Sequence, residues 1–119
     1  MTITRIQPNP GRLSHALVHN GIVYVTGQVP EDRTQDVNGQ TKQLLARIDE
    51  LLEAAGSDKS NILFAQIWLK HAVKDFSEMN AAWSEWIPHN ALPARATVES
   101  NLAAEDILVE IALQAAVKG

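Results

Sequence analysis

The hydrophobic positions alternate in the first quarter of the chain and then change to a helical period. Thr2–Gln7, Ala16–His19 and Ile22–Gly27 have the alternating, β-prone pattern of short strands. Pro8-Asn9-Pro10-Gly11 is expected to end the first of them. Asn20-Gly21 separates the other two. Because both of its residues tolerate positive φ, this dipeptide predicts a type I′ hairpin turn.

A polar, turn-rich segment, Pro30–Gly39, precedes a helix that the pattern predicts from about Gln40. The apolar residues of this helix share one face, away from most of its charged residues. They are Leu44, Ile48, Leu51, Leu52 and Ala55. Gly56 follows them and suits the left-handed conformation that ends many helices.

The next segment, Ile62–Leu69, is rich in β-branched and aromatic residues and predicts a buried strand. Asp75 is expected to open a second helix, because Glu78 three residues later completes a pair like a capping box. Pro88 is expected to stop that helix. Its apolar stripe comprises Phe76, Met79, Trp83, Trp86 and Ile87.

Two more strands are predicted at Arg95–Ser100 and Ile107–Val117, which gives the order β-β-β-α-β-α-β-β over one domain, residues 1–119. Strand–helix–strand units need crossovers, so both helices are expected on one face of a single mixed sheet of about six strands. This is a two-layer α+β fold. The chain has no third layer to cover the other sheet face, and oligomerisation through that face is the economical solution.

Charge and composition narrow the possible functions. The chain has no cysteine, which excludes disulfides, thiolate metal sites and a cysteine nucleophile. A net charge of −4, with basic residues scattered singly, argues against a nucleic-acid partner. No apolar run has the length of a membrane span, and the N-terminus lacks a signal-peptide pattern. We therefore expect a cytoplasmic protein without a membrane partner.

The four histidines do not predict a metal site. His15 and His19 share a strand face, but four residues of strand span roughly 13 Å, too far for zinc–nitrogen bonds of about 2 Å. A phosphate-binding glycine loop, a dinucleotide fingerprint and a nucleophile elbow are also absent from the sequence. We expect neither a metal nor an organic cofactor.

Arg95 is the first candidate for chemistry, because it stands at the start of a strand directly after Pro93-Ala94. Alternation places it on the same face as Thr97 and Glu99. A guanidinium there presents a planar fork that can hold a carboxylate through two parallel hydrogen bonds. The alternative is a solvated arginine or one paired with Glu99.

Glu110 is the second candidate, since it lies inside the otherwise apolar segment Ile107–Leu113. An unpaired buried carboxylate is costly, so this residue has an arginine partner, a chemical task or a solvent-facing position. If its surroundings desolvate it, its pKa rises toward values useful for general acid–base catalysis.

Weaker signals come from Asn80 and from Thr26-Gly27. Asn80 interrupts the apolar stripe of the second helix and either caps a neighbouring loop or reaches a site. Gly27, at a strand end, permits close approach of a ligand or another chain. The three tryptophans, at positions 68, 83 and 86, are more typical of a core than of a cofactor platform.

Together these segments resemble the Rid/YjgF family of imine deaminases, and in particular its short, YoaB-type or RutC-like branch. The resemblance covers nearly the whole chain from about Gly21. It rests on pieces in the family order: Val25–Pro30, Gln40-Thr41, Ala54-Ala55-Gly56, Asp75-Phe76 with Asn80, Pro93-Ala94-Arg95 and Val109-Glu110-Ile111.

The resemblance implies a chorismate-mutase-like fold and a homotrimer with a site between each pair of neighbours. It also implies hydrolysis of 2-imino acids, or their enamine tautomers, to 2-keto acids and ammonia. Arg95 would hold the substrate carboxylate and Glu110 the attacking water. Backbone near Thr97, Thr26 and Gly27 would contact the imine, and Asn80 would lie at the rim of the cleft.

Three positions depart from the family pattern, and they bear on substrate identity. Leu13 stands where studied members have a tyrosine, Thr97 where they often have a cysteine, and Ala112 where a second glutamate is usual. A trimeric module that binds small carboxylates without turnover remains an alternative. A ribonuclease activity, once attached to some relatives, is a more remote one, and hydrolysis of aminoacrylate-type enamines would follow nearly the same mechanism.

Overall fold

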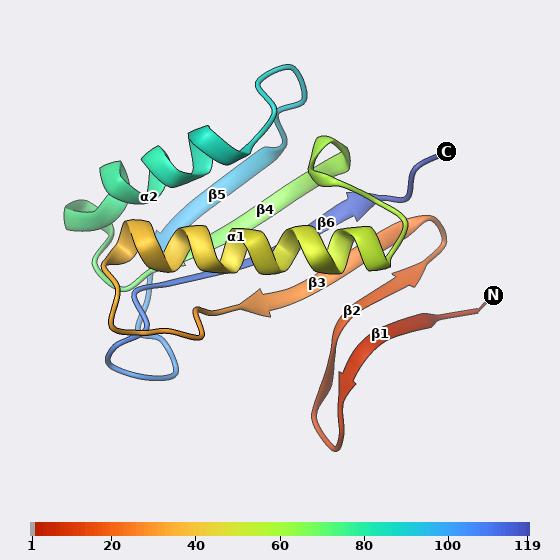
Figure 1. Cartoon of the computed structure of the whole chain (residues 1–119), viewed down its shortest axis with the longest axis horizontal. Coiled ribbons are helices and arrows are strands. Elements are labelled where there is room, and N and C mark those ends of the chain that lie inside the picture. Colours follow the sequence, from red (N-terminus) through yellow and green to blue (C-terminus); the bar gives the residue numbers. More distant parts are fainter. Residues whose placement is uncertain (1) are drawn as a thin grey trace.

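The strands and helices follow one another in the predicted order in the computed structural model, which describes residues 2–119 (Figure 1). The strands are β1 (Thr4–Asn9), β2 (Leu13–His19), β3 (Ile22–Gln28), β4 (Ile62–Leu69), β5 (Ala94–Glu99) and β6 (Val109–Ala116). The α-helices are α1 (Val37–Ala54) and α2 (Ala72–Trp86), and a 3-10 turn, Lys59–Asn61, precedes β4. The predicted α+β class is confirmed.

All six of these strands form one sheet in the order β1-β2-β3-β6-β4-β5. Only β4 and β5 are parallel, with α2 as their crossover, and the other neighbours are antiparallel. Figure 1 shows both helices across the same face of the sheet, as predicted. The last strand in the sequence, β6, lies in the middle of the sheet, between β3 and β4.

The hydrophobic core lies between the helices and the sheet. Along β6, Val109, Ile111 and Leu113 are buried beneath the helices, and so are Ala65 and Ile67 of β4. We call this side the helix-covered face. The intervening residues of the same strands point to the other side, which we call the open face.

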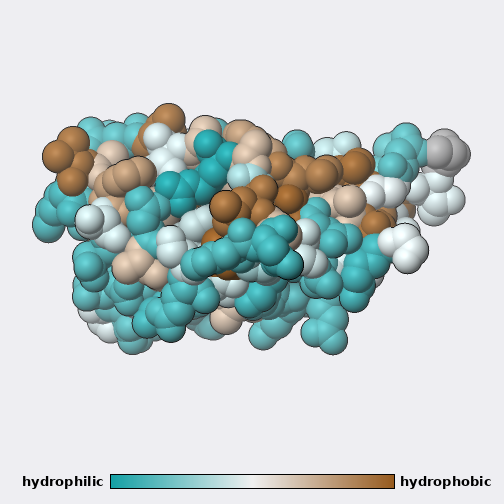
Figure 2. Space-filling view, turned by 90° about the horizontal axis from the view of Figure 1, so that it is seen from above, coloured by the Kyte–Doolittle hydropathy of each residue, from teal (hydrophilic) through white to brown (hydrophobic). Residues whose placement is uncertain are grey.

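Apolar side chains remain exposed on the open face. Tyr24 of β3 and Phe64 of β4 alternate with buried core residues along their strands. Val98 of β5 pairs with Trp68, an open-face residue of β4. Figure 2, a view along the sheet, shows apolar residues gathered toward one side of the molecule and hydrophilic residues over the other. Among the described residues, no helix is long and apolar enough to cross a membrane.

The hairpin between β2 and β3 confirms the turn prediction. Asn20 and Gly21 have φ angles of 53° and 76°, as a type I′ turn requires. The first strand, however, runs through Pro8 to Asn9 instead of ending at Gln7. A proline is tolerated there because β1 is an edge strand, so its missing N–H need not serve a second neighbour.

Helix α1 begins earlier than predicted, at Val37 instead of Gln40. The carboxylate of Asp36 accepts a hydrogen bond from the Gly39 N–H at 2.9 Å, which caps the first turn. This cap outweighs the low helix propensity of Gly39. The predicted end is confirmed, since Gly56 has a φ of 79° just beyond the helix.

Helix α2 begins at Ala72, so the predicted start at Asp75 and its capping box are wrong. The free N–H of Ala72 donates to Glu99 Oε1 at 3.0 Å, and Glu99 lies at the end of β5. Asp75 instead lies in the first helical turn, where its negative charge interacts favourably with the positive end of the helix dipole. Because the capping residue is so distant in the sequence, the residues around the start of α2 contain no pattern that predicts it.

Candidate functional site

Arg95 lies on β5, at the edge of the sheet, and projects toward the helix-covered face. It pairs in register with Ala65, which is buried beneath the helices. Its guanidinium carbon lies 5.4 Å from the centre of the Trp83 ring and 6.0 Å from that of Phe76. Phe76 and Trp83 are seven residues apart on α2 and therefore share one helical face. The two rings hold the guanidinium through cation–π contacts.

The guanidinium of Arg95 forms no ion pair with any carboxylate of residues 2–119. Pairing with Glu99, one alternative from the sequence, does not occur, because that carboxylate caps α2 at Ala72. Burial lowers the pKa of Arg95. A half-buried cation without a counter-ion can accommodate an anionic group.

Glu110 projects from β6 onto the open face, directly opposite Trp68 of β4. Its carboxyl group lies against Gly27 on the other side: a Cβ atom built on Gly27 would be 2.9 Å from the Glu110 Cδ and would collide with its Oε2. Desolvation raises the pKa of Glu110. Its carboxyl has no ion-pair partner in the described part of the chain.

A bulge in β3 makes this close approach possible. The register between β3 and β6 shifts between Val25 and Gln28, so Thr26 and Gly27 together lie opposite the single residue Ala112. Gln28 then pairs with Ile111 and is buried toward the helices. Only a residue without a side chain fits between the bulged backbone and the Glu110 carboxyl.

Arg95 and Glu110 therefore do not converge within one protomer. β4 lies between their strands, so two strand spacings of about 4.8 Å separate them laterally. Their side chains also leave the sheet on opposite faces. The sequence predicted both as candidates, but it did not indicate that they point in opposite directions.

The other candidates divide between these two sides. Thr97 shares the Arg95 face, and its Oγ1 is buried without a hydrogen-bond partner among the described residues. Asn80 lies along α2 between the two rings that hold Arg95, and it is half-buried. The Thr26 carbonyl, in the bulge itself, accepts a hydrogen bond from Gln28 Nε2 at 3.1 Å. Leu13, at the start of β2, is 43% exposed.

The tryptophans also fall on different sides. Trp83 belongs to the core, and Trp86 packs against it. Trp68 is half-buried on the open face, where it forms one wall beside Glu110. The core prediction from the sequence is therefore correct for two of the three.

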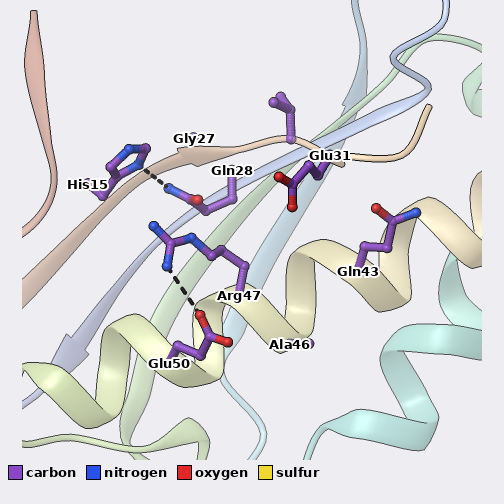
Figure 3. Close-up of a pocket in the computed structure, with 9 residues that line it drawn as sticks. His15, Gly27, Gln28, Glu31, Gln43, Ala46, Arg47 and Glu50 are labelled. Atoms are coloured by element: carbon purple, nitrogen blue, oxygen red, sulfur yellow. Dashed lines mark hydrogen bonds and ion pairs between the residues drawn. The ribbon is translucent and has the colours of Figure 1, made fainter. Parts of the chain in front are cut away.

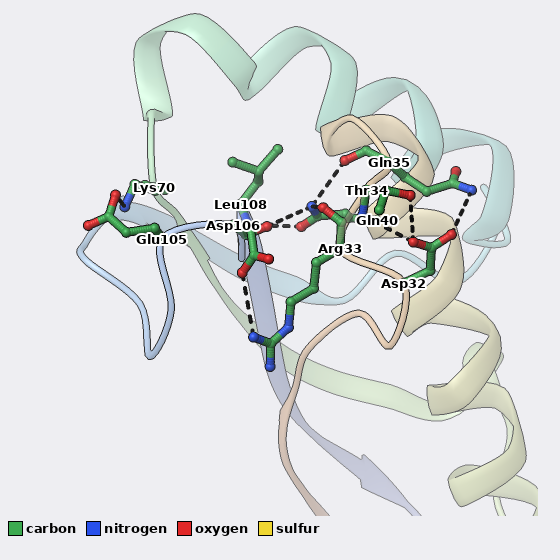
Figure 4. A network of polar contacts seen from close by, with 9 residues as sticks. All are labelled: Asp32, Arg33, Thr34, Gln35, Gln40, Lys70, Glu105, Asp106 and Leu108. Carbon is green, nitrogen blue, oxygen red and sulfur yellow. Dashed lines mark hydrogen bonds and ion pairs between the residues drawn. The ribbon is translucent and has the colours of Figure 1, made fainter.

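Gln40 is a supporting residue whose contacts the sequence did not reveal (Figure 4). It is fully buried. Its Nε2 donates to the carbonyls of Asp106 at 2.9 Å and Gln35 at 3.1 Å, and its Oε1 accepts from the Leu108 N–H at 2.8 Å. These bonds fix the chain just before Glu110 and the loop before α1.

A cavity of about 570 Å³ opens on the helix-covered side, between β3 and α1 (Figure 3). Gly27 is the one predicted site residue among those that line it. The lining contains neither Arg95 nor Glu110, so the cavity shares only Gly27 with the candidate site.

Comparisons with known proteins agree with this fold. The family model described as "Endoribonuclease L-PSP" matches residues 3–117. A RutC family protein of Haemophilus influenzae is 49% identical over 114 residues, covering 95% of this chain and 97% of the relative. The RutC family protein YoaB of Escherichia coli is 44% identical over 117 residues, covering 98% and 100%.

Among solved structures, NMB1025 of Neisseria meningitidis, a member of the YjgF protein family, superposes with a TM-score of 0.95. The two share 38% identity, and the match covers 100% of this chain and 98% of that one. The chain belongs to the Rid/YjgF/RutC family. Membership extends across the sheet and both helices, so the elements that carry Arg95 and Glu110 lie inside the shared fold.

Proposed function

We propose that this Rid/YjgF/RutC protein hydrolyses reactive 2-imino acids, or their enamine tautomers, to 2-keto acids and ammonia. The observation that carries the proposal is the unpaired guanidinium of Arg95, held between Phe76 and Trp83. A fixed, partly desolvated guanidinium is suited to the carboxylate of a small acid. Glu110, a desolvated carboxyl group with a raised pKa, supplies the acid–base partner.

The active site in this proposal lies between two subunits of a homotrimer. Because Arg95 and Glu110 leave the sheet on opposite faces, one protomer cannot present both to one small substrate. A neighbour packed against the open face would bring its own Arg95 toward Glu110. The exposed apolar side chains of Tyr24, Phe64 and Val98 favour burial of that face against a second copy.

One side of the site would bind the substrate carboxylate. Arg95 would donate two parallel hydrogen bonds to its oxygens, and the stacking rings would keep the guanidinium plane fixed. Asn80 and Thr97 lie on the same side and would contact atoms near the carboxylate. Because these contacts would hold the substrate in one orientation, the entropic cost of reaching the reactive arrangement would be lower.

The other side would carry the chemistry. A water held by the Glu110 carboxylate attacks C2 of the C=N bond, and the carboxylate takes one of its protons. The protonated Glu110 then returns this proton to the substrate nitrogen, which gives a carbinolamine. A second proton passes from the carbinolamine hydroxyl group to the nitrogen through Glu110, and the C2–N bond breaks to give the 2-keto acid and ammonia. The imine carbon is already electrophilic, so positioning and proton transfer suffice.

Backbone at Gly27 and Thr26 would contact the imine nitrogen beside Glu110, and the exposed Leu13 would supply an apolar wall. A leucine in place of a tyrosine offers no hydroxyl to the substrate. We therefore expect small aliphatic imines to be preferred over polar ones that need a hydrogen bond at this wall.

Two other functions use parts of the same surface. A carboxylate-binding module would need Arg95 but not an ionisable Glu110, so Glu110→Gln separates it from the deaminase. Ribonuclease activity would need clustered cations, whereas Arg33, Arg47 and Lys70 are engaged with nearby carboxylates. The deaminase proposal accounts for both Arg95 and Glu110.

The direct test generates 2-imino acids in the presence of the purified protein. An amino-acid oxidase or a pyridoxal-phosphate dehydratase would produce the imine, and semicarbazide would trap what remains. We expect less semicarbazone in the presence of the protein, with the 2-keto acid formed faster. If small, branched and aromatic imines all survive unchanged, the carboxylate-binding module is the better description.

A further inference from the structure

Apart from the backbone of Gly27, the cavity between β3 and α1 takes no part in the proposed reaction, yet it has the size of a small-molecule site (Figure 3). Its volume of about 570 Å³ lies within the range of roughly 300–1,000 Å³ typical of such sites. It is on the helix-covered side of the sheet, whereas Glu110 lies on the open face. The cavity walls come from the end of β3, from the following loop and from one side of α1.

Gln28 is the most informative residue in this cavity. The residue is only 5% exposed, and its Nε2 donates to the Thr26 carbonyl at 3.1 Å. That bond fixes the orientation of the amide, because only the nitrogen can donate to a carbonyl. The Gln28 Oε1 has no hydrogen-bond partner in the described chain and is accessible from the cavity, so it can accept a hydrogen bond from a bound group. A hydrogen-bond acceptor without a protein partner therefore faces the cavity.

Two carboxylates line the same cavity. Glu31 follows β3 and has no hydrogen bond or ion pair among residues 2–119, and Glu50 comes from α1. Arg47 is the one arginine or lysine in the lining. The two glutamates and one arginine give the lining a formal charge of −1. The field of the cavity favours a cation.

Arg47 is poorly placed to receive an anion instead. Its Nη1 donates to Glu50 at 3.2 Å, and its Nη2 donates to the side chain of Gln7. The amide of Gln43 is also occupied, since it both donates to and accepts from the backbone of Asp32. The groups left free are mainly acceptors: the Gln28 Oε1, the Glu31 carboxylate and the second oxygen of Glu50.

We infer that this cavity is a second ligand site, which binds a primary ammonium group on a short aliphatic chain. The ammonium would donate its three N–H groups to the Gln28 Oε1 and to the carboxylates of Glu31 and Glu50. The side chains of Val29 and Ala46 would contact the aliphatic part. The inference does not depend on imine hydrolysis, because it uses neither Arg95 nor Glu110.

The test is a titration of the protein with butylammonium chloride, at constant ionic strength near 150 mM. Amide NMR spectra of ¹⁵N-labelled protein would follow the Gln28 side chain and the Gly27 backbone. We expect saturable shifts at both. Glu31→Gln and Glu50→Gln should each raise the dissociation constant about fivefold, as expected for the loss of a solvent-accessible ion pair. Glu53→Gln, the same change on an exposed residue of α1 outside the cavity, should leave it unaltered.

Three control compounds test whether the cavity selects for a cation. 1-Butanol has the chain without the charge, butyrate reverses the charge and glycine carries both charges, and none of them should saturate the shifts. The inference is overturned if butylammonium causes no saturable shift at the cavity, or if the Glu31→Gln/Glu50→Gln double variant binds it as tightly as the unaltered protein. Stronger binding of butyrate or glycine would instead identify Arg47 as an anion receptor and equally overturn it.

Discussion

The guanidinium of Arg95 and the carboxyl group of Glu110 leave one sheet on opposite faces, although a single strand separates β5 from β6. A reaction that needs both groups must then draw them from different chains. This relationship connects the proposed trimer to the proposed chemistry and makes both testable by mixing variants.

We predict that two inactive variants restore activity when they share a trimer. Arg95→Ala chains retain Glu110, and Glu110→Gln chains retain Arg95, so a mixed interface can combine the two intact residues. After unfolding and refolding together in equal amounts, about one quarter of the sites should be intact, and deamination should return to about that fraction. The same variants refolded separately and then mixed provide the control. Activity that never exceeds theirs would contradict a shared site.

Arg95→Ala should lower kcat/KM for small 2-imino acids by about 100-fold, because two charge-assisted hydrogen bonds worth roughly 3 kcal/mol are lost. Arg95→Lys should also be poor, since one ammonium cannot reproduce the planar fork. Arg12→Ala, an exposed arginine in the turn after β1, serves as the matched control. Semicarbazide trapping measures all three, and light scattering checks that the oligomer persists. Unchanged turnover by Arg95→Ala would contradict the proposed function.

Glu110→Gln should change the pH dependence of stability as well as turnover. The pKa of Glu110 is raised in the folded protein above its ordinary value of 4.5 by desolvation. Its protonated form therefore favours folding below that value, and this contribution is lost as pH rises through the folded-state pKa. The glutamine variant should melt at a higher temperature than the unaltered protein near pH 7. The difference should vanish below pH 4.5, and a constant difference at every pH would contradict the raised pKa.

Gly27→Ala should inactivate the protein while leaving it folded. The added Cβ would displace only the far end of the Glu110 side chain, which can rotate away from its place beside the bulge. Gly119→Ala offers a control, because an added Cβ there would meet no atom within 4 Å. Assays of both variants should show lost turnover for the first and full turnover for the second. Equal activities would mean that the position of Glu110 is unimportant.

Gln40→Leu should lower the free energy of unfolding by about 3–4 kcal/mol, since it leaves several buried backbone groups without partners. Gln43→Leu loses two bonds to Asp32 at an exposed position and should cost about 1 kcal/mol. Urea unfolding of both variants measures the difference. A similar small loss in each would show that the Gln40 contacts do not hold the loops together.

The sequence predicted the fold well where local patterns decide the structure. The alternating segments, the Asn20-Gly21 turn and the apolar face of α1 each depend on neighbours in the chain, and each is confirmed. The start of α2 was wrong because its cap comes from Glu99, twenty-seven residues away in the sequence. Local patterns do not contain such a contact.

For the candidate site too, the sequence predicted what depends on local residues and missed what depends on contacts between distant ones. Arg95 and Glu110 stood out because each is a charged residue in a strand. Their opposite directions depend on the strand register, and the clamp on Arg95 depends on the way α2 packs across β5. The cavity beside Gln28 could not be predicted, because its lining joins residues from separate elements that carry no shared motif.

The central place of β6 also has a consequence for how the protein is made. The strand that joins β3 to β4 is the last to be synthesised, so on the ribosome the β1-β2-β3 meander and the β4-α2-β5 unit have no strand between them. The part of the proposed site around Arg95 belongs to the second of these and can form as soon as that unit emerges. The part around Glu110 requires the completed chain. A nascent chain stalled before Val109 would expose two unpaired strand edges, which are prone to aggregation.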